Sequence, residues 1–294
     1  FKGADRYFWV KRNTEATPLE FWKEVKKYCD EAGILFFSTP MSRGAAQKLN
    51  QAGVNLWKVG SGDILDFVTL DYIASTGKPI ILSSGMSTLE ELDKSIIFLA
   101  KRNAPVALLH CVSKYPCPPQ ELKIETLNFL EKRYGLPVGF SDHSIEITST
   151  LVAVAMGAKI IEKHFSLDRG LWGSDHKVSL NPREFKKMSA SIRRMENNFI
   201  LKKRVASAYK NNFSNNGGKT LQDDEAVFRP YFRKSLMAGK NILAGERITA
   251  DALYAMRPQA HANGLPSEEY ESVIGKIAAK NFKKYDPITW DAIN

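Results

Sequence analysis

The chain alternates short apolar runs with longer segments in which apolar residues recur every three or four positions. Short apolar runs are typical of buried strands, and the longer spacing is typical of amphipathic helices. A first helix is expected after Thr17, with Pro18 at its first position and Phe21, Val25 and Tyr28 on one face. Strand, turn and helix then recur six times. The predicted strands are residues 34–37, 56–59, 79–82, 106–109, 136–139 and 160–161.

These six units predict an α/β protein with a parallel sheet. Strands that are apolar throughout are buried on both faces, as in parallel sheets covered by helices. No Gly-x-Gly-x-x-Gly turn follows the first strand, so a dinucleotide-binding fold is not indicated. The pattern instead favours a (β/α)8 TIM barrel, of which about six of the eight units are present. We expect about two units to be missing at the amino end.

The pattern changes after the helix predicted for residues 182–199. Residues 205–228 are polar and rich in Gly and Asn, which predicts a linker or loop. The remainder is a small β-rich module with short strands expected at 235–238, 253–256 and 276–279. The predicted domains are therefore a barrel at 1–204, a linker at 205–228 and a β-rich module at 229–294.

Composition excludes several classes of protein. Apolar residues make up 44% and charged residues 25%, as in an ordinary soluble globular protein. No apolar run approaches the ~20 residues of a membrane span, and no signal sequence is visible. Cys29, Cys111 and Cys117 indicate reduced thiols in a cytoplasmic protein. The net charge of +10 is scattered among acidic residues, so a small anionic substrate is expected rather than nucleic acid.

Every predicted strand ends in polar residues, and the carboxyl ends of parallel strands meet at one edge, where α/β enzymes carry their sites. The Gly/Ser turns suit a phosphate, and Lys58 adds positive charge. His143 and His164 could share one divalent metal, with Glu162 beside them. One such histidine could equally be structural, but six polar ends favour a site. His110, Cys111 and Cys117 are expected to be packed residues without a ligand.

These strand ends also carry a family resemblance. The chain resembles the sialic acid synthase family, whose members have a TIM barrel followed by an antifreeze-like (SAF) domain. The module near Arg257-Pro258 and Gly264 resembles that SAF domain. The motifs are Trp57-Lys58-Val59-Gly60-Ser61-Gly62, Leu82-Ser83-Ser84-Gly85-Met86, Tyr115-Pro116-Cys117-Pro118-Pro119, Gly139-Phe140-Ser141-Asp142-His143, Ile161-Glu162-Lys163-His164-Phe165, Asp168-Arg169 and Gly173-Ser174-Asp175-His176-Lys177.

The resemblance implies condensation of phosphoenolpyruvate with N-acetylmannosamine or a related N-acyl sugar, releasing phosphate. It implies a metal, manganese or else magnesium or cobalt, held by His143 and His164, with Glu162 and Asp63 as catalytic carboxylates. It also implies a homodimer in which Arg257 of the SAF domain reaches the partner's sugar. The expected substrate-binding residues are Thr39, Lys58, Ser61, Ser83, Ser113, Tyr115, Ser141, Asp175, His176 and Arg257.

Departures from the family pattern leave alternatives open. The family's amino-terminal catalytic carboxylate and phosphate-binding lysine have no counterpart here, so a non-catalytic truncated remnant is one alternative. Ser113 stands where the family usually has Asn, and the Leu171-Trp172-Gly173 loop also hints at another sugar. The second alternative is therefore a legionaminic-type, pseudaminic-type or spore-coat polysaccharide synthase of the same family.

Overall fold

The computed structural model describes residues 17–173, 175–213 and 218–294. Predictions for residues 1–16, 174 and 214–217, including the start of the barrel domain and part of the linker, lie outside the described residues. The chain forms two compact units. The first comprises Phe1–Ile80, Ser95–Pro105 and Pro230–Asn294, and the second comprises Ile81–Lys94 and Val106–Arg229.

A sheet in sequence order defines the fold class. Its strands are β1 (Trp57–Val59), β2 (Ile80–Ser83), β3 (Val106–Cys111), β4 (Val138–Asp142) and β5 (Ile161–Lys163), in the order β1-β2-β3-β4-β5. β3 pairs with β4, and β4 with β5, in parallel. A doubly wound sheet would reverse direction part way along this order. The order of the strands therefore agrees with the predicted barrel type, with five strands where six were expected.

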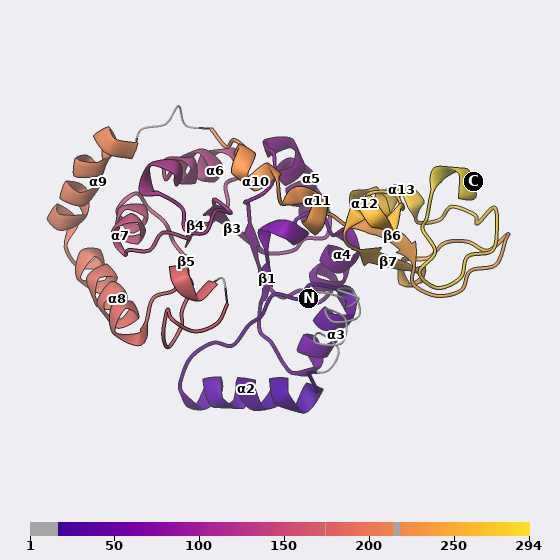
Figure 1. Cartoon of the computed structure of the whole chain (residues 1–294), viewed down its shortest axis with the longest axis horizontal. Coiled ribbons are helices and arrows are strands. Elements are labelled where there is room, and N and C mark those ends of the chain that lie inside the picture. Colours follow the sequence, from indigo (N-terminus) through magenta and orange to yellow (C-terminus); the bar gives the residue numbers. More distant parts are fainter. Residues whose placement is uncertain (1–16, 174, 214–217) are drawn as a thin grey trace. The chain divides into compact units, whose positions relative to one another are not determined.

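Helices of the second unit pack on its strands (Figure 1). α6 (Thr126–Tyr134) packs against β3 and β4, and α7 (Thr148–Ala155) packs against β4. α8 (Pro182–Glu196) and α9 (Phe199–Phe213) pack on α7. α8 starts where the sequence predicts, because Asn181 accepts the Glu184 N–H at 3.0 Å and Pro182 occupies the first helical position. α5 (Leu89–Ala100) has residues in both units.

Gly139 lets β4 lie against its neighbours. A Cβ atom at this position would lie 2.4 Å from the Ile160 carbonyl oxygen and 2.7 Å from the Leu109 Cδ2 atom. Any side chain would push these strands apart, so the close approach requires glycine. The same strand ends in Ser141 and Asp142.

The first unit combines three helices with the carboxyl-terminal module. α2 (Leu19–Glu31) packs on α3 (Arg43–Gln51), and α3 packs on α4 (Phe67–Ser75). In the module, β6 (Ser235–Ala238) and β7 (Leu253–Met256) are antiparallel, and α4 contacts β7. The remaining short helices of the chain are η1 (Ser61–Asp63), η2 (Pro119–Glu121), η3 (Asp175–Val178), α10 (Asp223–Ala226), α11 (Arg229–Phe232), η4 (Ala250–Ala252), α12 (Gln259–Ala262), η5 (Ser267–Glu269), α13 (Tyr270–Val273) and η6 (Trp290–Ala292).

Two predicted strands are wrong. Residues 34–37 form no strand, since only Ser38 bridges to Trp57, and Ile34 is 61% exposed. Residues 276–279 make single bridges to two different neighbours, Arg247 with Ile277 and Ala278 with Ile293. The first run makes no bridge of its own among the described residues. Backbone hydrogen bonds of the second run are divided between residues 245–248 and 292–294, so it makes isolated bridges rather than a strand.

The segment predicted as a linker or loop is partly helical. Residues 205–213 continue α9, and α10 covers four further residues. Ala206 and Ala208 are strong helix formers, and an exposed helix tolerates the polar residues around them. The prediction extended the Gly/Asn-rich character of the later residues too far toward the amino end. The predicted domain boundaries themselves stay a prediction.

No helix in the described ranges combines the length and apolar character needed to cross a membrane.

Candidate active site

The carboxyl ends of β3, β4 and β5 bring polar residues side by side. Parallel register places Cys111 beside Ser141, Ser141 beside Glu162, and Asp142 beside Lys163. Residues that follow neighbouring strands in this register must emerge next to one another. The polar residues at the ends of these three strands are therefore neighbours in the second unit.

Two imidazole rings converge just beyond these strand ends. His143 follows β4 and His164 follows β5, and their ring centroids lie 5.3 Å apart. The ring centroid of Tyr115 lies 4.1 Å from that of His143 and 5.7 Å from that of His164. The structure thus brings together three residues that the sequence predicted for one site.

The imidazole of His143 is held in one tautomer. Its Nδ1 atom lies 2.7 Å from the Val112 carbonyl oxygen, and a carbonyl only accepts, so Nδ1 carries the hydrogen. Nε2 is then the unprotonated nitrogen of neutral His143, and Cys111 also forms a side-chain hydrogen bond with this imidazole. His143 is buried, whereas His164 is partly exposed.

The two histidines differ in their affinity for protons. Burial lowers the pKa of His143, but Cys111, the Val112 carbonyl and Glu162 outweigh burial and the net direction is upward. Burial and the neighbouring His143 lower the pKa of His164, against the attraction of Asp175. Two imidazoles this close disfavour two positive charges, so the first proton belongs on His143.

A buried hydroxyl orients the neighbouring carboxylate. Ser141 donates from Oγ to Glu162 Oε1 at 2.6 Å. Ser83 and Ser113, which follow β2 and β3, are also buried. A serine hydroxyl has one donor hydrogen, and that of Ser141 is directed at Glu162.

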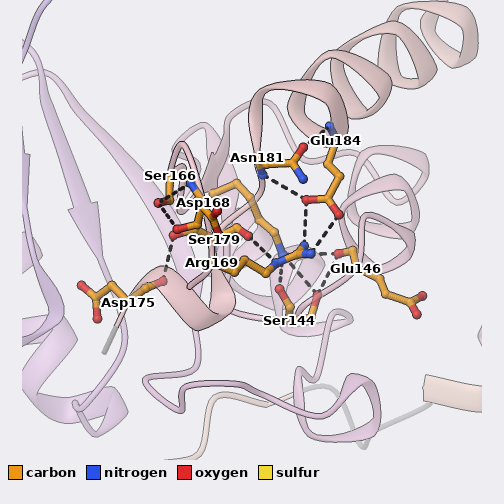
Figure 2. A network of polar contacts seen from close by, with 10 residues as sticks. Ser144, Glu146, Ser166, Asp168, Arg169, Asp175, Ser179, Asn181 and Glu184 are labelled. Carbon is orange, nitrogen blue, oxygen red and sulfur yellow. Dashed lines mark hydrogen bonds and ion pairs between the residues drawn. The ribbon is translucent and has the colours of Figure 1, made fainter. Parts of the chain in front are cut away.

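Side chains of the loop after β5 form hydrogen bonds within the loop and to α8 (Figure 2). Arg169 donates to both carboxylate oxygens of Glu184 at 2.9 and 2.8 Å and to the Ser179 carbonyl at 2.9 Å. His176 Nδ1 lies 2.6 Å from Ser166 Oγ. Asp175, 4.0 Å from His164 Nδ1, keeps 65% of its side chain exposed. Asp175 thus stands beside the histidines, while His176 bonds within its own loop.

The other predicted site residues lie in the first unit. Lys58 is buried and donates from Nζ to the Val59 carbonyl at 3.2 Å. Asp63 pairs with Lys234 at 2.7 Å, and Arg257 Nη1 lies 3.5 Å from Asp63. Asp66 is the second carboxylate on Lys234. Thr39 and Ser61 are the remaining predicted site residues of the first unit, and Ser61 is buried at the start of η1.

Asp63 therefore holds the carboxyl-terminal module in place. Burial lowers the pKa of Lys234, but Asp63 and Asp66 outweigh burial and keep its pKa above the ordinary value. A lysine held charged between two carboxylates needs both of them. This contact within one chain gives Asp63 a structural role beside its predicted catalytic one.

Sequence reasoning gave no role to two buried acidic residues of the second unit, although one of them, Asp142, stands in a motif quoted above. Asp142 pairs with Lys163 at 3.1 Å, with both side chains fully buried. Glu225 of α10 is 1% exposed and lies in the segment predicted as linker. The capping box between Gln222 and Glu225 was visible as a spacing of three residues and could have indicated the short helix.

His110 is packed, as predicted. Its Nε2 atom donates to the Leu122 carbonyl at 2.6 Å, and its ring stacks on Phe140 at 5.9 Å. Burial lowers the pKa of His110 from 6.5 to about 4. The folded state therefore holds this residue neutral at neutral pH.

We expect His110 to make the second unit sensitive to mild acid. The unfolded chain binds a proton near pH 6.5, whereas folded His110 resists protonation down to about 4. Stability present above pH 6.5 is therefore lost as the pH falls toward 4, by roughly 2 kcal/mol between pH 7 and pH 5. Urea unfolding at both pH values should show a smaller loss for His110→Gln. An equal loss in both proteins would contradict this assignment.

Two family models match separate parts of the chain. The family model described as NeuB family matches residues 3–203, and the SAF domain model matches residues 233–294. An N,N'-diacetyllegionaminic acid synthase from Campylobacter jejuni is 36% identical over 269 residues, which is 90% of this chain and 75% of the relative.

Two solved structures are also similar to this chain. The spore coat polysaccharide biosynthesis protein SpsE from Bacillus subtilis superposes with a TM-score of 0.78 at 30% identity, covering 95% of this chain and 78% of its own. An N-acetylneuraminic acid synthetase from Leptospira borgpetersenii superposes with a TM-score of 0.59 at 31% identity, covering 72% and 69%.

Proposed function

Because the chain belongs to the NeuB family, we propose that it condenses phosphoenolpyruvate with N-acetylmannosamine or a related N-acyl sugar to form a nonulosonic acid and phosphate. The observation that carries the proposal is the convergence of His143, His164 and Tyr115 beyond β4 and β5. Buried hydroxyls stand at the ends of the neighbouring strands. This combination suits a polar, anionic pair of substrates.

The proposed reaction forms one carbon–carbon bond. Carbon 3 of phosphoenolpyruvate bonds to the aldehyde carbon of the sugar, whose oxygen takes up a proton. Water adds to carbon 2 and loses one proton, which leaves a hydroxyl on that carbon. The bond from carbon 2 to the phosphate oxygen then breaks, the hydroxyl becomes the keto group, and its proton leaves with the phosphate. Glu162, oriented by Ser141 at 2.6 Å, accepts the proton of that water. Ser83 is assigned to the anionic groups of phosphoenolpyruvate, and Ser113 is assigned to the sugar.

A divalent metal, with manganese preferred, is part of the proposal. The residues fit a metal site, because the Val112 bond leaves Nε2 of neutral His143 unprotonated, as in a metal-binding imidazole, and His164 lies beside it. Within the described part of the chain, no cluster of three or more His, Cys, Asp or Glu residues is suited to a metal. The proposed ligands are the imidazoles of His143 and His164, and the other positions would be open to water and the sugar. A metal there would polarise the aldehyde of the sugar.

Removing bound metal with EDTA is expected to lower phosphate release by at least about a hundredfold. Added Mn²⁺ should restore the rate, with Mg²⁺ or Co²⁺ restoring part of it. The measurement is phosphate release from phosphoenolpyruvate and N-acetylmannosamine before dialysis, after dialysis and after each addition. Full activity in protein shown by elemental analysis to hold no metal would contradict the metal requirement.

The proposal leaves the sugar to be identified by experiment. The relatives named above make different acids, and Ser113 with the exposed Trp172 loop departs from the sialic acid pattern. A panel of N-acetylmannosamine and a 2,4-diacetamido-trideoxy sugar discriminates between a sialic and a legionaminic-type synthase. A homodimer in which Arg257 serves the partner's site belongs to the same proposal, as does a cytoplasmic reaction, since phosphoenolpyruvate is made inside the cell.

A test of the function itself is dependence on both substrates. Phosphate release should need phosphoenolpyruvate and sugar together. Folded protein that releases no phosphate with any sugar of the panel, with metal present, would instead support the non-catalytic remnant.

A further inference from the structure

A strap of chain, residues 218–229, crosses the loops of the second unit. It begins with the Gly218 carbonyl, which accepts from Thr126 Oγ1 at 3.3 Å. Thr220 accepts from Lys123 Nζ at 2.6 Å. Further along, Gln222 donates to the Glu121 carbonyl at 2.9 Å, Asp224 pairs with Lys114 at 2.7 Å, and Arg229 pairs with Glu91. The strap is therefore attached along its length.

Glu225 is the buried centre of the strap. Its Oε1 atom accepts two backbone N–H groups, from Met86 at 3.0 Å and from Ser113 at 2.8 Å. Its Oε2 atom accepts the Gln222 N–H at 3.3 Å. With 1% of its surface exposed, this carboxylate depends on those donors, because a buried charge without partners is costly.

The two N–H groups belong to different loops. Met86 follows β2, three residues after Ser83, and Ser113 follows β3, two residues before Tyr115. Met86 also has a φ of +50°, a conformation that a residue with a side chain adopts only where its surroundings hold it. Glu225 thus fixes a strained loop and ties it to its neighbour through one oxygen atom.

We propose that Glu225 is a positioning residue that sets the spacing between the loop carrying Ser83 and the loop carrying Ser113 and Tyr115. This proposal rests on the proposed function for its effect on catalysis. In that reaction the first loop holds the phosphate of phosphoenolpyruvate and the second contacts the sugar. A carboxylate that bonds both loops controls the distance between the two substrates, and an error of about 1 Å can cost about a hundredfold in rate.

Substitution of Glu225 separates positioning from folding. Glu225→Ala removes the acceptor for both loops, and Glu225→Gln keeps one acceptor oxygen while placing an amide N–H against Gln222. We expect kcat/KM to fall about a hundredfold for Glu225→Ala and about tenfold for Glu225→Gln, with KM rising for both substrates. Asp223→Asn, an exposed position of α10 two residues before Glu225, should match wild type.

Hydrogen exchange supplies a readout that does not depend on the reaction. Amide exchange in peptides containing Met86 and Ser113 should accelerate in Glu225→Ala and Glu225→Gln, while peptides from β3 and β4 keep their wild-type rates. If Glu225→Ala fails to fold, Glu225→Gln still decides the result.

Each outcome decides a separate point. Accelerated exchange together with raised KM supports the proposal. Unchanged exchange, or a lowered melting temperature with wild-type KM values, overturns it. If wild-type protein is inactive, the proposed function fails and the catalytic role of Glu225 fails with it, while the exchange rates alone decide whether the carboxylate ties the loops.

Discussion

Replacing either His143 or His164 with alanine is expected to lower kcat/KM for sugar-dependent phosphate release by at least about a thousandfold. Their rings lie 5.3 Å apart, and the Val112 carbonyl fixes the orientation of His143. Residues that act as one unit show non-additive losses. The double variant should therefore be little worse than either single variant.

Control substitutions make this result specific. His261 is exposed on α12, and His261→Ala should retain wild-type kinetics and metal content. Each active-site variant should keep the far-UV circular dichroism of the wild type. If His143→Ala or His164→Ala kept kcat/KM within about tenfold of wild type, the imidazole pair would not be the reactive centre.

The second large effect concerns stability. Asp142 and Lys163 form a fully buried ion pair at 3.1 Å. Asp142 also accepts the Thr150 hydroxyl at 2.6 Å and the Ser144 N–H at 2.8 Å. Removing one partner leaves the other charge buried alone, so Lys163→Met should destabilise the second unit by about 3–5 kcal/mol.

The same pair supports the site. Lys163 donates to the carbonyls of Ser144 and Glu146, which lie one and three residues after His143 in the chain and are drawn in Figure 2. The pair therefore fixes the backbone just beyond the imidazole. We expect Lys163→Met to weaken metal binding as well as folding.

Urea unfolding measures the stability effect. The matched control is Glu196→Gln, which breaks the exposed Arg193–Glu196 pair of α8 and should cost less than about 1 kcal/mol. Combining Lys163→Met with Asp142→Leu should recover part of the loss, because no unpaired charge remains. A Lys163→Met variant as stable as the Glu196→Gln control would show that the buried pair contributes little.

Local pattern was enough to predict the strands that are buried between neighbours. Val138 to Asp142 was readable because an apolar run ends abruptly in Ser, Asp and His. Parallel register then brings such ends together, and this places His143 near His164. The pairing of the two histidines could thus be predicted from sequence.

Contacts between distant parts of the chain could not be predicted in this way. Glu225 is separated from Ser113 by 112 residues, and the sequence gives no sign that the two meet. The run at 34–37 has the composition of a strand, but strand formation depends on a neighbour that composition does not reveal. Asp63 was assigned from family resemblance alone, and its pairing with Lys234 depends on how the module packs.

Product analysis tests the central claim most directly. The protein is incubated with Mn²⁺, carbon-13-labelled phosphoenolpyruvate and each sugar of the panel, and the products are separated by mass spectrometry. We predict a nonulosonic acid that contains all three labelled carbons, with one phosphate released for each product molecule. Labelled pyruvate in place of that acid, or no labelled product from folded, metal-loaded protein, would contradict the account.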